Sequence, residues 1–273
     1  MADRLAAVLR LLDLQPDGPD VFLAATPHEG PGRLFGGQVA SQSLRAAMLT
    51  VDPGRPPHSF HAYFVRPGRP GEALRLTVER TREGRSFSTR QVTASQNGEA
   101  IFILSSSFHA PEPGDDWQLP APAAVPDPES LAPPSTQGRL AMLPPFDVRP
   151  VAGPGPGGLP VIHPYWVQVR GEVPDDPAVH VALLAYLSDL GVVGSARAPG
   201  STAAPFAGAS LDHAMWFHRP ARVDQWLLYS VDPVSNFGAR GLARGTLHDQ
   251  QGRLVASVAQ EALLRPAGGP ALP

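Results

Sequence analysis

The sequence contains no cysteine. Disulfide bonds, catalysis by a thiolate and cysteine-ligated metal are therefore excluded. Charged residues are also few, at 17% of 273 residues, and the formal net charge is only −3. Because the chain has no excess of positive charge, we expect it to bind neither nucleic acid nor an anionic membrane surface. An anionic ligand would need a local basic patch.

Long hydrophobic runs are missing as well, and no stretch is long enough to cross a membrane. Residues 1–14 have the pattern of a short amphipathic helix and lack the apolar core and cleavage site of a signal peptide. The last three residues are not a peroxisomal signal. With 42% hydrophobic residues, the composition is that of a folded protein, which we expect to be cytoplasmic.

Proline, in contrast, is abundant, with 33 residues, many of them between Pro111 and Pro160. Such a stretch disfavours helices and central strands. We therefore predict two folded halves, residues 1–110 and 161–273, joined by a proline-rich connection over residues 111–160.

Hydrophobic patterning and turn signals predict the same order of elements in both halves, a strand and a helix followed by further strands. In the first half the segments are 21–26, 38–49, 58–65, 73–80, 86–96 and 100–109. In the second half they are 163–170, 179–190, 210–218, 226–231, 239–248 and 254–264. The segments His61–Pro67 and His213–Pro220 also share residues. An internal duplication explains this order, and chance similarity of β-rich segments is the alternative.

The helix expected in the second half is apolar on every face except for Ser188 and Asp189. A helix of this kind should be buried. A helix followed by antiparallel strands indicates an α+β fold, and a sheet curled around a central helix would bury that helix.

Asp189 is the only charged residue between His180 and Arg197. Burying a carboxylate is costly, and the dipole at the C-terminus of a helix disfavours negative charge. Two unfavourable placements at once indicate a functional role. The sequence leaves one alternative open, an aspartate at a frayed helix end that faces solvent.

Two further polar residues lie on predicted strands. Ser210 begins a strand, and alternation places it on the same face as Asp212. Gln260 shares a face with apolar residues of the last strand, where an amide needs hydrogen-bond partners. Taken singly, each is also explained by a structural hydrogen bond. Adjacent strand residues point to opposite faces, so we interpret the pair Asp212-His213 as structural.

Several longer motifs occur in order along the chain. In the first half they are residues 34–38, 58–64, 85–88 and 96–98, which read LFGGQ, HSFHAYF, RSFS and QNG. In the second half they are residues 211–220, 226–230 and 255–261, which read LDHAMWFHRP, WLLYS and VASVAQE. Together they resemble the two halves of bacterial acyl-CoA thioesterase II, the TesB-like family.

This resemblance implies a double hotdog fold, in which two fused modules each wrap an antiparallel sheet around a central helix. It implies that the chain hydrolyses fatty acyl-CoA to free fatty acid and coenzyme A. It also implies a catalytic triad of Asp189, Ser210 and Gln260 that activates water, with serine where many members of the family have threonine.

Thioester hydrolysis needs an attacking water, a proton acceptor and a group that stabilises the oxyanion. Asp189 would be the base, while Ser210 and Gln260 would hold the water. Backbone N–H groups at the helix start Gly36-Gly37-Gln38 would bind the oxyanion. Glycines needed only for tight helix packing are the alternative.

Two residues are candidates for binding the substrate elsewhere. Arg85 would meet the phosphates of coenzyme A, although a solvated charged face also explains it. Trp216 would line the acyl channel. The histidines show no metal-ligand spacing, so we expect no metal and no cofactor. Exposed sheet edges favour a homodimer or homotetramer.

One alternative mechanism and two alternative functions are less consistent with the sequence than water attack in a thioesterase. Ser210 as a nucleophile lacks a histidine at a predictable distance and a Gly-x-Ser-x-Gly motif. A lyase similar to enoyl-CoA hydratases would carry an aspartate and a histidine on one helix. No histidine follows Asp189 on its helix, which argues against this function. A non-catalytic acyl-CoA-binding protein would have no need of three competent polar side chains.

Overall fold

The computed structural model describes residues 2–26, 32–119, 125–133, 145–151, 164–198 and 206–266. The N-terminal part contains α1 (Ala2–Leu11), β1 (Gln15–Pro16), β2 (Val21–Ala24), α2 (Gly36–Met48), β3 (Pro57–Phe64), β4 (Leu74–Glu83), β5 (Phe87–Gln96) and β6 (Glu99–His109). Between the halves lie the 3-10 helix η1 (Pro128–Ser130) and β7 (Phe146–Pro150). The C-terminal part contains β8 (Tyr165–Val169), α3 (Pro177–Ser188), α4 (Val192–Ser195), β9 (Phe206–Ser210), β10 (Asp212–Phe217), β11 (Leu227–Phe237), β12 (Arg240–Asp249) and β13 (Leu254–Pro266).

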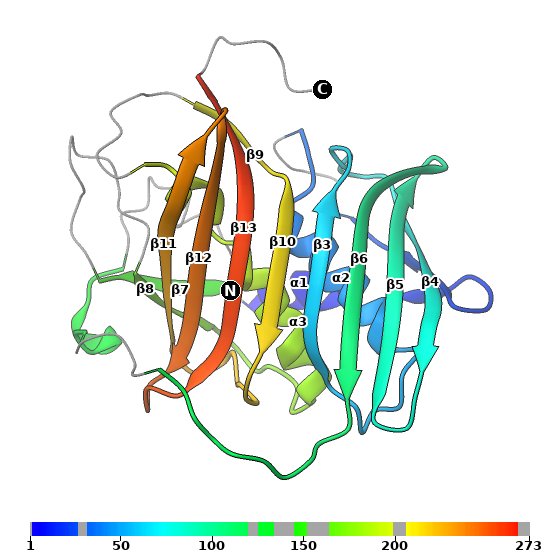
Figure 1. Cartoon of the computed structure of the whole chain (residues 1–273), viewed down its shortest axis with the longest axis horizontal. Coiled ribbons are helices and arrows are strands. Elements are labelled where there is room, and N and C mark those ends of the chain that lie inside the picture. Colours follow the sequence, from blue (N-terminus) through cyan, green and yellow to red (C-terminus); the bar gives the residue numbers. More distant parts are fainter. Residues whose placement is uncertain are drawn as a thin grey trace.

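The strands form one antiparallel sheet in the order β1-β2-β4-β5-β6-β3-β10-β13-β12-β11-β8-β7, and β9 pairs with β13 (Figure 1). The order β2-β4-β5-β6-β3 of the first half matches the order β8-β11-β12-β13-β10 of the second. The corresponding strands β3 and β10 pair with each other at the centre, with Phe60 opposite Met215 and Ala62 opposite His213. The halves are therefore related by a local two-fold axis. This architecture confirms the predicted α+β double hotdog fold.

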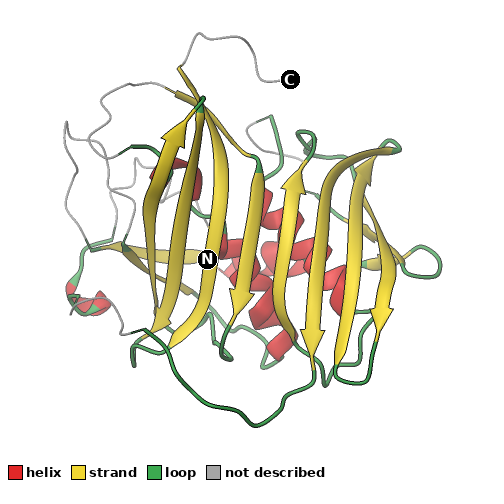
Figure 2. Ribbon diagram, viewed as in Figure 1, coloured by secondary structure: helices red, strands yellow, loops and turns green. Residues whose placement is uncertain are grey.

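The central helices α2 and α3 pack against each other on one face of the sheet, behind the strands in Figure 2. Ser41 Oγ on α2 donates a hydrogen bond to Ala182 O on α3 at 2.8 Å. Leu183, Leu184 and Leu187 of α3 are at most 2% exposed. Burying each leucine contributes about 1.5–3 kcal/mol. The apolar helix of the second half is thus buried, as its sequence predicts.

Several segments differ from the predicted boundaries. β4 and β11 extend to Glu83 and Phe237, beyond the predicted ends at residues 80 and 231, and three further segments differ in organisation. The helix expected over 179–190 ends at Ser188, and after a turn at Gly191, where φ is +80°, the short helix α4 follows. The strand expected over 210–218 is divided into β9 and β10. The connection predicted over 111–160 contains β7, which pairs with β8 at one edge of the sheet. An edge strand tolerates the prolines of that region because its outer N–H groups need no partner. No helix in the described ranges is long and apolar enough to span a bilayer.

Candidate active site

Asp189 is the C-cap residue of α3 and is 8% exposed. Buried tyrosines bind the carbonyl groups on either side of it. Tyr229 Oη donates to Ser188 O at 2.5 Å, and Tyr165 Oη donates to Leu190 O at 3.0 Å. These bonds satisfy carbonyl groups that the end of a helix leaves without partners. The turn that carries Asp189 is therefore fixed from strands β8 and β11.

The N-terminus of α2 meets the Asp189 carboxylate from the other half of the chain. Gly37 N–H donates to Oδ2 of Asp189 at 2.9 Å, a contact between residues 152 positions apart. Phe35, the residue before the helix, provides no side-chain cap, so Asp189 takes that role. The positive end of the α2 dipole favours the negative charge that the α3 dipole disfavours.

Two glycines allow this close approach. A Cβ atom at Gly36 would lie 2.7 Å from Oδ2 of Asp189 and 2.8 Å from the ring of Phe64. A Cβ atom at Gly37 would lie 2.2 Å from Tyr186 O. Neither distance is compatible with a side chain, so only glycine fits at these two positions. The glycines therefore serve tight packing, and that packing brings a backbone N–H to Asp189.

A buried chain of hydrogen bonds runs from β9 to the end of α3. Gln260 Nε2 donates to Ser210 Oγ at 2.9 Å, and Gln260 Oε1 lies 2.5 Å from Nδ1 of His213. On the other side of the imidazole, Nε2 lies 2.8 Å from Ser188 Oγ. His213 is 1% exposed, and Gln260 and Ser188 are fully buried. Ser188 is the residue directly before Asp189, so the chain returns to the same turn.

A bulge between β9 and β10 directs Ser210 into this chain. Ser210 pairs with Ala262, and Ala214 pairs with Ala259. Four steps along one strand (214 − 210) therefore lie opposite three steps along the other (262 − 259). Leu211 stands at the interruption between the two strands.

This bulge overturns one prediction. Regular alternation placed Ser210 on the same face as Asp212, but the extra residue reverses the alternation. Ser210 and His213 instead both contact Gln260, while Asp212 Oδ1 accepts a hydrogen bond from Glu261 N at 2.6 Å. Bulges commonly redirect side chains beside active sites.

Burial raises the pKa of Asp189 to about 7, while the Gln260 amide, the Gly37 N–H, the Arg33 charge and the Ser210 hydroxyl each lower it. Gln260 and Ser210 thus lie close enough to favour the ionised carboxylate. Even so, Oδ1 of Asp189 has no hydrogen-bond partner of normal geometry among the described residues. Gln260 and Ser210 therefore act on the Asp189 carboxylate through their electrostatic field, and Oδ1 remains able to accept a proton.

Burial lowers the pKa of His213 to about 4, opposed by the hydrogen bond with Gln260. The imidazole is therefore neutral at neutral pH and carries a single ring proton. It contributes no positive charge to the site.

The structure places the other predicted residues differently. Gln38 is buried, and its Nε2 donates to Gln42 Oε1 at 3.3 Å, inside α2. Arg85 is exposed in the turn between β4 and β5. Trp216 is 37% exposed on the outer face of β10, opposite to the buried Met215, and its ring lies 5.2 Å from that of His61. The structure thus brings the triad and the two glycines together and leaves Arg85 and Trp216 apart from them.

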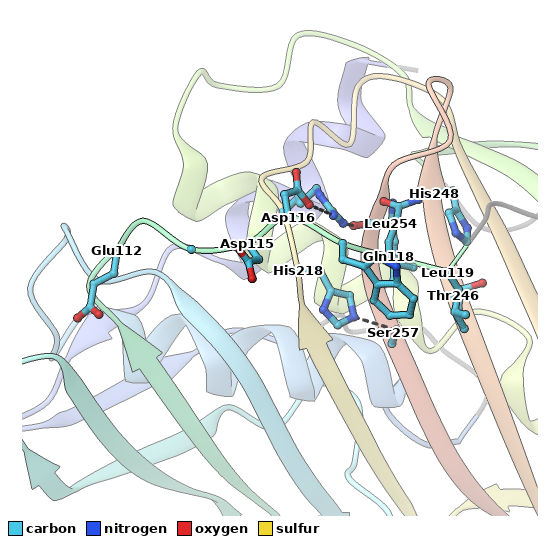
Figure 3. Close-up of a pocket in the computed structure, with 13 residues that line it drawn as sticks. Glu112, Asp115, Asp116, Gln118, Leu119, His218, Thr246, His248, Leu254 and Ser257 are labelled. Carbon is cyan, nitrogen blue, oxygen red and sulfur yellow. Dashed lines mark hydrogen bonds and ion pairs between the residues drawn. The ribbon is translucent and has the colours of Figure 1, made fainter.

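A separate hollow of about 850 Å³ lies on the outer face of the sheet, between the segment 112–119, His218 and Arg219 after the end of β10, and strands β12 and β13 (Figure 3). Gln118 attaches this segment to the β12–β13 turn, because its Nε2 donates to Gly252 O at 2.8 Å and its Oε1 accepts from Leu254 N at 2.9 Å. His218 Nε2 lies 2.9 Å from Ser257 Oγ on the wall of the hollow. No triad residue lines it.

Three site residues were not singled out for function from the sequence. Ser188 had a signal, because with Asp189 it interrupts an otherwise apolar helix. His213 had none, because the bulge that turns it inward cannot be recognised in the residue pattern. Arg33 Nη2 donates to Gly208 O at 2.7 Å, and its charge acts on Asp189. In the described part of the chain, no group of three or more His, Asp or Glu side chains is placed to bind a metal ion.

The fold and this polar cluster define a double hotdog protein with a candidate site at the junction of its halves. The family described as acyl-CoA thioesterase matches residues 147–263, and the family described as acyl-CoA thioesterase N-terminal domain matches residues 25–109. The chain is 36% identical to human acyl-coenzyme A thioesterase 8, covering 96% of this chain and 90% of that protein. It is 34% identical to acyl-CoA thioesterase 2 of Haemophilus influenzae, covering 97% and 99% of the two chains.

Solved structures agree with these sequence matches. Acyl-CoA thioesterase II TesB2 from Mycobacterium marinum superposes with a TM-score of 0.82 at 39% identity, covering 96% of this chain and 99% of that one. A tesB protein from Mycobacterium avium subspecies paratuberculosis gives a TM-score of 0.83 at 33% identity, covering 96% and 100%. The chain belongs to the TesB-like acyl-CoA thioesterase family.

Proposed function

We propose that the chain hydrolyses fatty acyl-CoA to free fatty acid and coenzyme A by a water that Asp189, Ser210 and Gln260 activate. The observation that carries this proposal is the state of Asp189. Its carboxylate is buried, has a pKa of about 7, and keeps Oδ1 free of hydrogen bonds to the described residues. A base whose pKa is near neutral is suited to proton transfer at physiological pH. Membership of the family supplies the class of substrate.

In the first step, the water oxygen bonds to the thioester carbonyl carbon while one water proton passes to Oδ1 of Asp189. Ser210 and Gln260 hold the water, since a hydroxyl and an amide both donate and accept. The product of this step is a tetrahedral oxyanion.

In the second step, the carbon–sulfur bond breaks and its electron pair leaves with the sulfur of coenzyme A. Asp189 returns its proton to that sulfur and is again ionised. The fatty acid leaves and loses its remaining acidic proton to solvent. No metal or cofactor takes part in these steps.

We place the oxyanion at the start of α2. Gly37 N–H is bonded to Asp189, and Gln38 N–H is bonded to Phe35 O at 3.1 Å. The N–H of Gly36 has no acceptor among the described residues. It is therefore the donor at this turn that an oxyanion would meet, with the positive end of the helix dipole behind it.

Water attack is favoured over an acyl-enzyme on Ser210 by the contacts of the serine. Its Oγ accepts a hydrogen bond from Gln260, and the nearby His213 contacts Gln260 and Ser188 instead. A serine nucleophile needs a base that takes its proton, and no histidine contacts Ser210 in the described structure.

The test is release of free thiol from short, medium and long acyl-CoA by the native chain and by Asp189→Asn. Removing the base should lower kcat at least about a hundredfold. Asp232→Asn, at an exposed aspartate of β11, is the matched control and should keep native activity. If Asp189→Asn retains activity, the mechanism is wrong. If the native chain releases no thiol from any acyl-CoA, the chain is instead a binding protein or a lyase that leaves the thioester intact.

We also propose that the chain forms a homodimer or homotetramer. The edge strands give this little support, because β1 and β7 are short and contain Pro16 and Pro150, which hinder pairing. The support comes from the outer face of the sheet, where Tyr63 is 66% exposed and Trp216 is 37% exposed. Sedimentation equilibrium of the native chain measures the state, and a monomer at all concentrations would refute this proposal.

A further inference from the structure

We propose that His213 is a positioning residue that fixes the orientation of the Gln260 amide through a proton on Nδ1. The proposal rests on the proposed function, because it assigns how one member of the triad is held. His213 does not touch the reacting atoms. It acts through Gln260, and Ser188 supports it from the other side of the ring.

The contacts define two arrangements of the chain. In the first, Nδ1–H donates to Gln260 Oε1 at 2.5 Å, and the Gln260 amide N–H donates to Ser210 Oγ at 2.9 Å. A neutral ring then has an accepting Nε2, and Ser188 Oγ lies 2.8 Å from it. Ser188 Oγ also lies 2.8 Å from Ala185 O, so in this arrangement its single proton points to Nε2 instead.

In the second arrangement, every hydrogen bond is reversed. Nε2–H donates to Ser188, Ser188 donates to Ala185 O, and Nδ1 accepts from a flipped Gln260 amide. Ser210 then donates to Oε1. This chain is also complete, so hydrogen-bond counting alone does not choose between the two.

Asp189 makes the choice. Gln260 lies beside the buried Asp189 carboxylate, with Nε2 at 2.9 Å from Ser210 Oγ and Oε1 at 2.5 Å from Nδ1 of His213. An amide stabilises a neighbouring carboxylate only with its N–H groups turned towards that carboxylate. The second arrangement would turn the carbonyl oxygen Oε1 towards a negative charge in a buried site, where unfavourable electrostatic contacts are strong. While Asp189 is ionised, the proton of His213 therefore lies on Nδ1 and locks the amide in its productive orientation.

Two substitutions separate the ring nitrogens. In His213→Asn, the amide nitrogen takes approximately the place of Nδ1 and can still donate to Gln260. In His213→Gln, it takes approximately the place of Nε2 and keeps the contact with Ser188 alone. We expect His213→Asn to retain kcat within about threefold, and His213→Gln to lower kcat at least about tenfold with little change in KM, because the loss is of transition-state contacts. Equal losses in the two variants would overturn the proposal.

The pH profile gives a readout that a merely structural role would not move. The groups that face Asp189 are Gln260, Ser210, the Gly37 N–H, Arg33, and the hydroxyls of the tyrosines Tyr165, Tyr186 and Tyr229. Of these, only the Gln260 amide is released by His213→Gln. In His213→Gln, loss of the amide that stabilises the ionised Asp189 raises the pKa of Asp189, so the acid limb of the kcat profile moves to higher pH. His213→Asn keeps the amide in place and should leave that limb unchanged.

A second measurement does not depend on any variant or on activity. Nitrogen-15 NMR of histidine-labelled native chain at pH 9, with the His213 signal assigned by its absence in His213→Asn, reports which ring nitrogen carries the proton. A proton on Nδ1 supports the proposal, and a proton on Nε2 overturns it. If the native chain releases no thiol from acyl-CoA, the proposed function fails while this spectrum still decides the role of His213 in holding Gln260.

Discussion

The unfolding free energy of Asp189→Asn, compared with that of the native chain, should increase as pH rises. The carboxyl group has a pKa of about 7 in the folded chain and a usual value of 3.8. The folded state therefore binds this proton more tightly than the unfolded state does. The stabilisation from the protonated group is complete below pH 3.8 and is lost as pH rises through about 7.

The magnitude follows from the size of this shift. About three pKa units correspond to about 4 kcal/mol over the whole range, at 1.36 kcal/mol for each unit. Between pH 5 and pH 9, the native chain should lose about 3 kcal/mol of unfolding free energy through this one group. The side chain is only 8% exposed, so solvent screening does not reduce this figure much. Asparagine cannot ionise and keeps an acceptor for Gly37 N–H.

Urea denaturation followed by tryptophan fluorescence at pH 5, 7 and 9 measures the effect, because the chain has four tryptophans. The quantity compared is the difference in unfolding free energy between Asp189→Asn and the native chain. Taking this difference removes the other titrating groups, which both proteins share. Asp232→Asn, at an exposed position of β11, should show no pH-dependent difference. A difference for Asp189→Asn that stays constant from pH 5 to pH 9 would refute the reasoning that burial of the carboxylate sets its pKa.

Three further outcomes follow from the site. Gly37→Ala places a Cβ atom 2.2 Å from Tyr186 O, so it should lower the unfolding free energy by at least about 1–3 kcal/mol and remove most of the thiol release. Gly54→Ala is the control and should have neither effect, because the nearest atom to its Cβ belongs to a flexible side chain at 3.2 Å. Ser210→Ala should lower kcat by about tenfold or more, and Ser210→Thr should restore it, because threonine keeps the hydroxyl that Gln260 contacts and that we propose holds the water. Tyr229→Phe removes the bond to Ser188 O and should cost about 1–3 kcal/mol in urea denaturation, with a matching loss of kcat if it loosens the Asp189 turn.

Local patterns were sufficient to predict most of the fold. Alternating apolar residues bounded by turns such as Asn97-Gly98 predict β5 and β6 to within a residue at each end. The buried helix of the second half and the order of strands in both halves follow from the same kind of signal. The strand pairing β3–β10 was not visible, because pairing between strands far apart in sequence leaves no local trace.

The sequence predicted the site only where the polarity of a residue differs from that of its neighbours. Asp189 stands out as a charge in an apolar helix, and the structure shows it buried. Its contact with Gly37 spans 152 positions and depends on how α2 and α3 pack, which no local pattern reports. The bulge at Leu211 adds one residue to a strand and reverses every side chain beyond it.

That one-residue shift also corrects the apparent repeat between His61 and His213. The register places His61 opposite Ala214 and Phe60 opposite Met215. The bulge after Ala94, which pairs with Phe102, matches the bulge after Leu247, which pairs with Ala256. Phe102 of β6 thus corresponds to Ala256 of β13, and the registers of β3–β6 and β10–β13 then make Phe60 correspond to His213 and His61 to Ala214. His61 accordingly lies on the exposed face of the sheet, while His213 lies inside.

The same correspondence explains why the junction of two similar halves holds an asymmetric site. The C-cap residue of α3 is Asp189, whereas that of α2 is Leu49, which is 46% exposed. By register, Gln260 corresponds to Ser106, as His213 does to Phe60. The first half thus has no carboxylate, imidazole or amide at the equivalent positions.

The N-terminus of α3, which corresponds to the N-terminus of α2, also lacks a free N–H donor for such a contact. α2 begins with Gly36 and Gly37, and the N–H of Gly37 donates to the carboxylate of the other half, but α3 begins with Pro177, which has no N–H to donate. Asp176 caps α3 from within its own half, since its Oδ1 accepts from Ala178 N at 2.9 Å. One half therefore has a helix N-terminus without a cap of its own, the other half has a buried carboxylate, and the bond from Gly37 N–H to Asp189 joins them. Each half contributes one central helix, so two contacts between a helix N-terminus and a helix C-terminus are possible. Because the helix ends differ between the halves, only the contact between the N-terminus of α2 and the C-terminus of α3 has the groups of a chemical site.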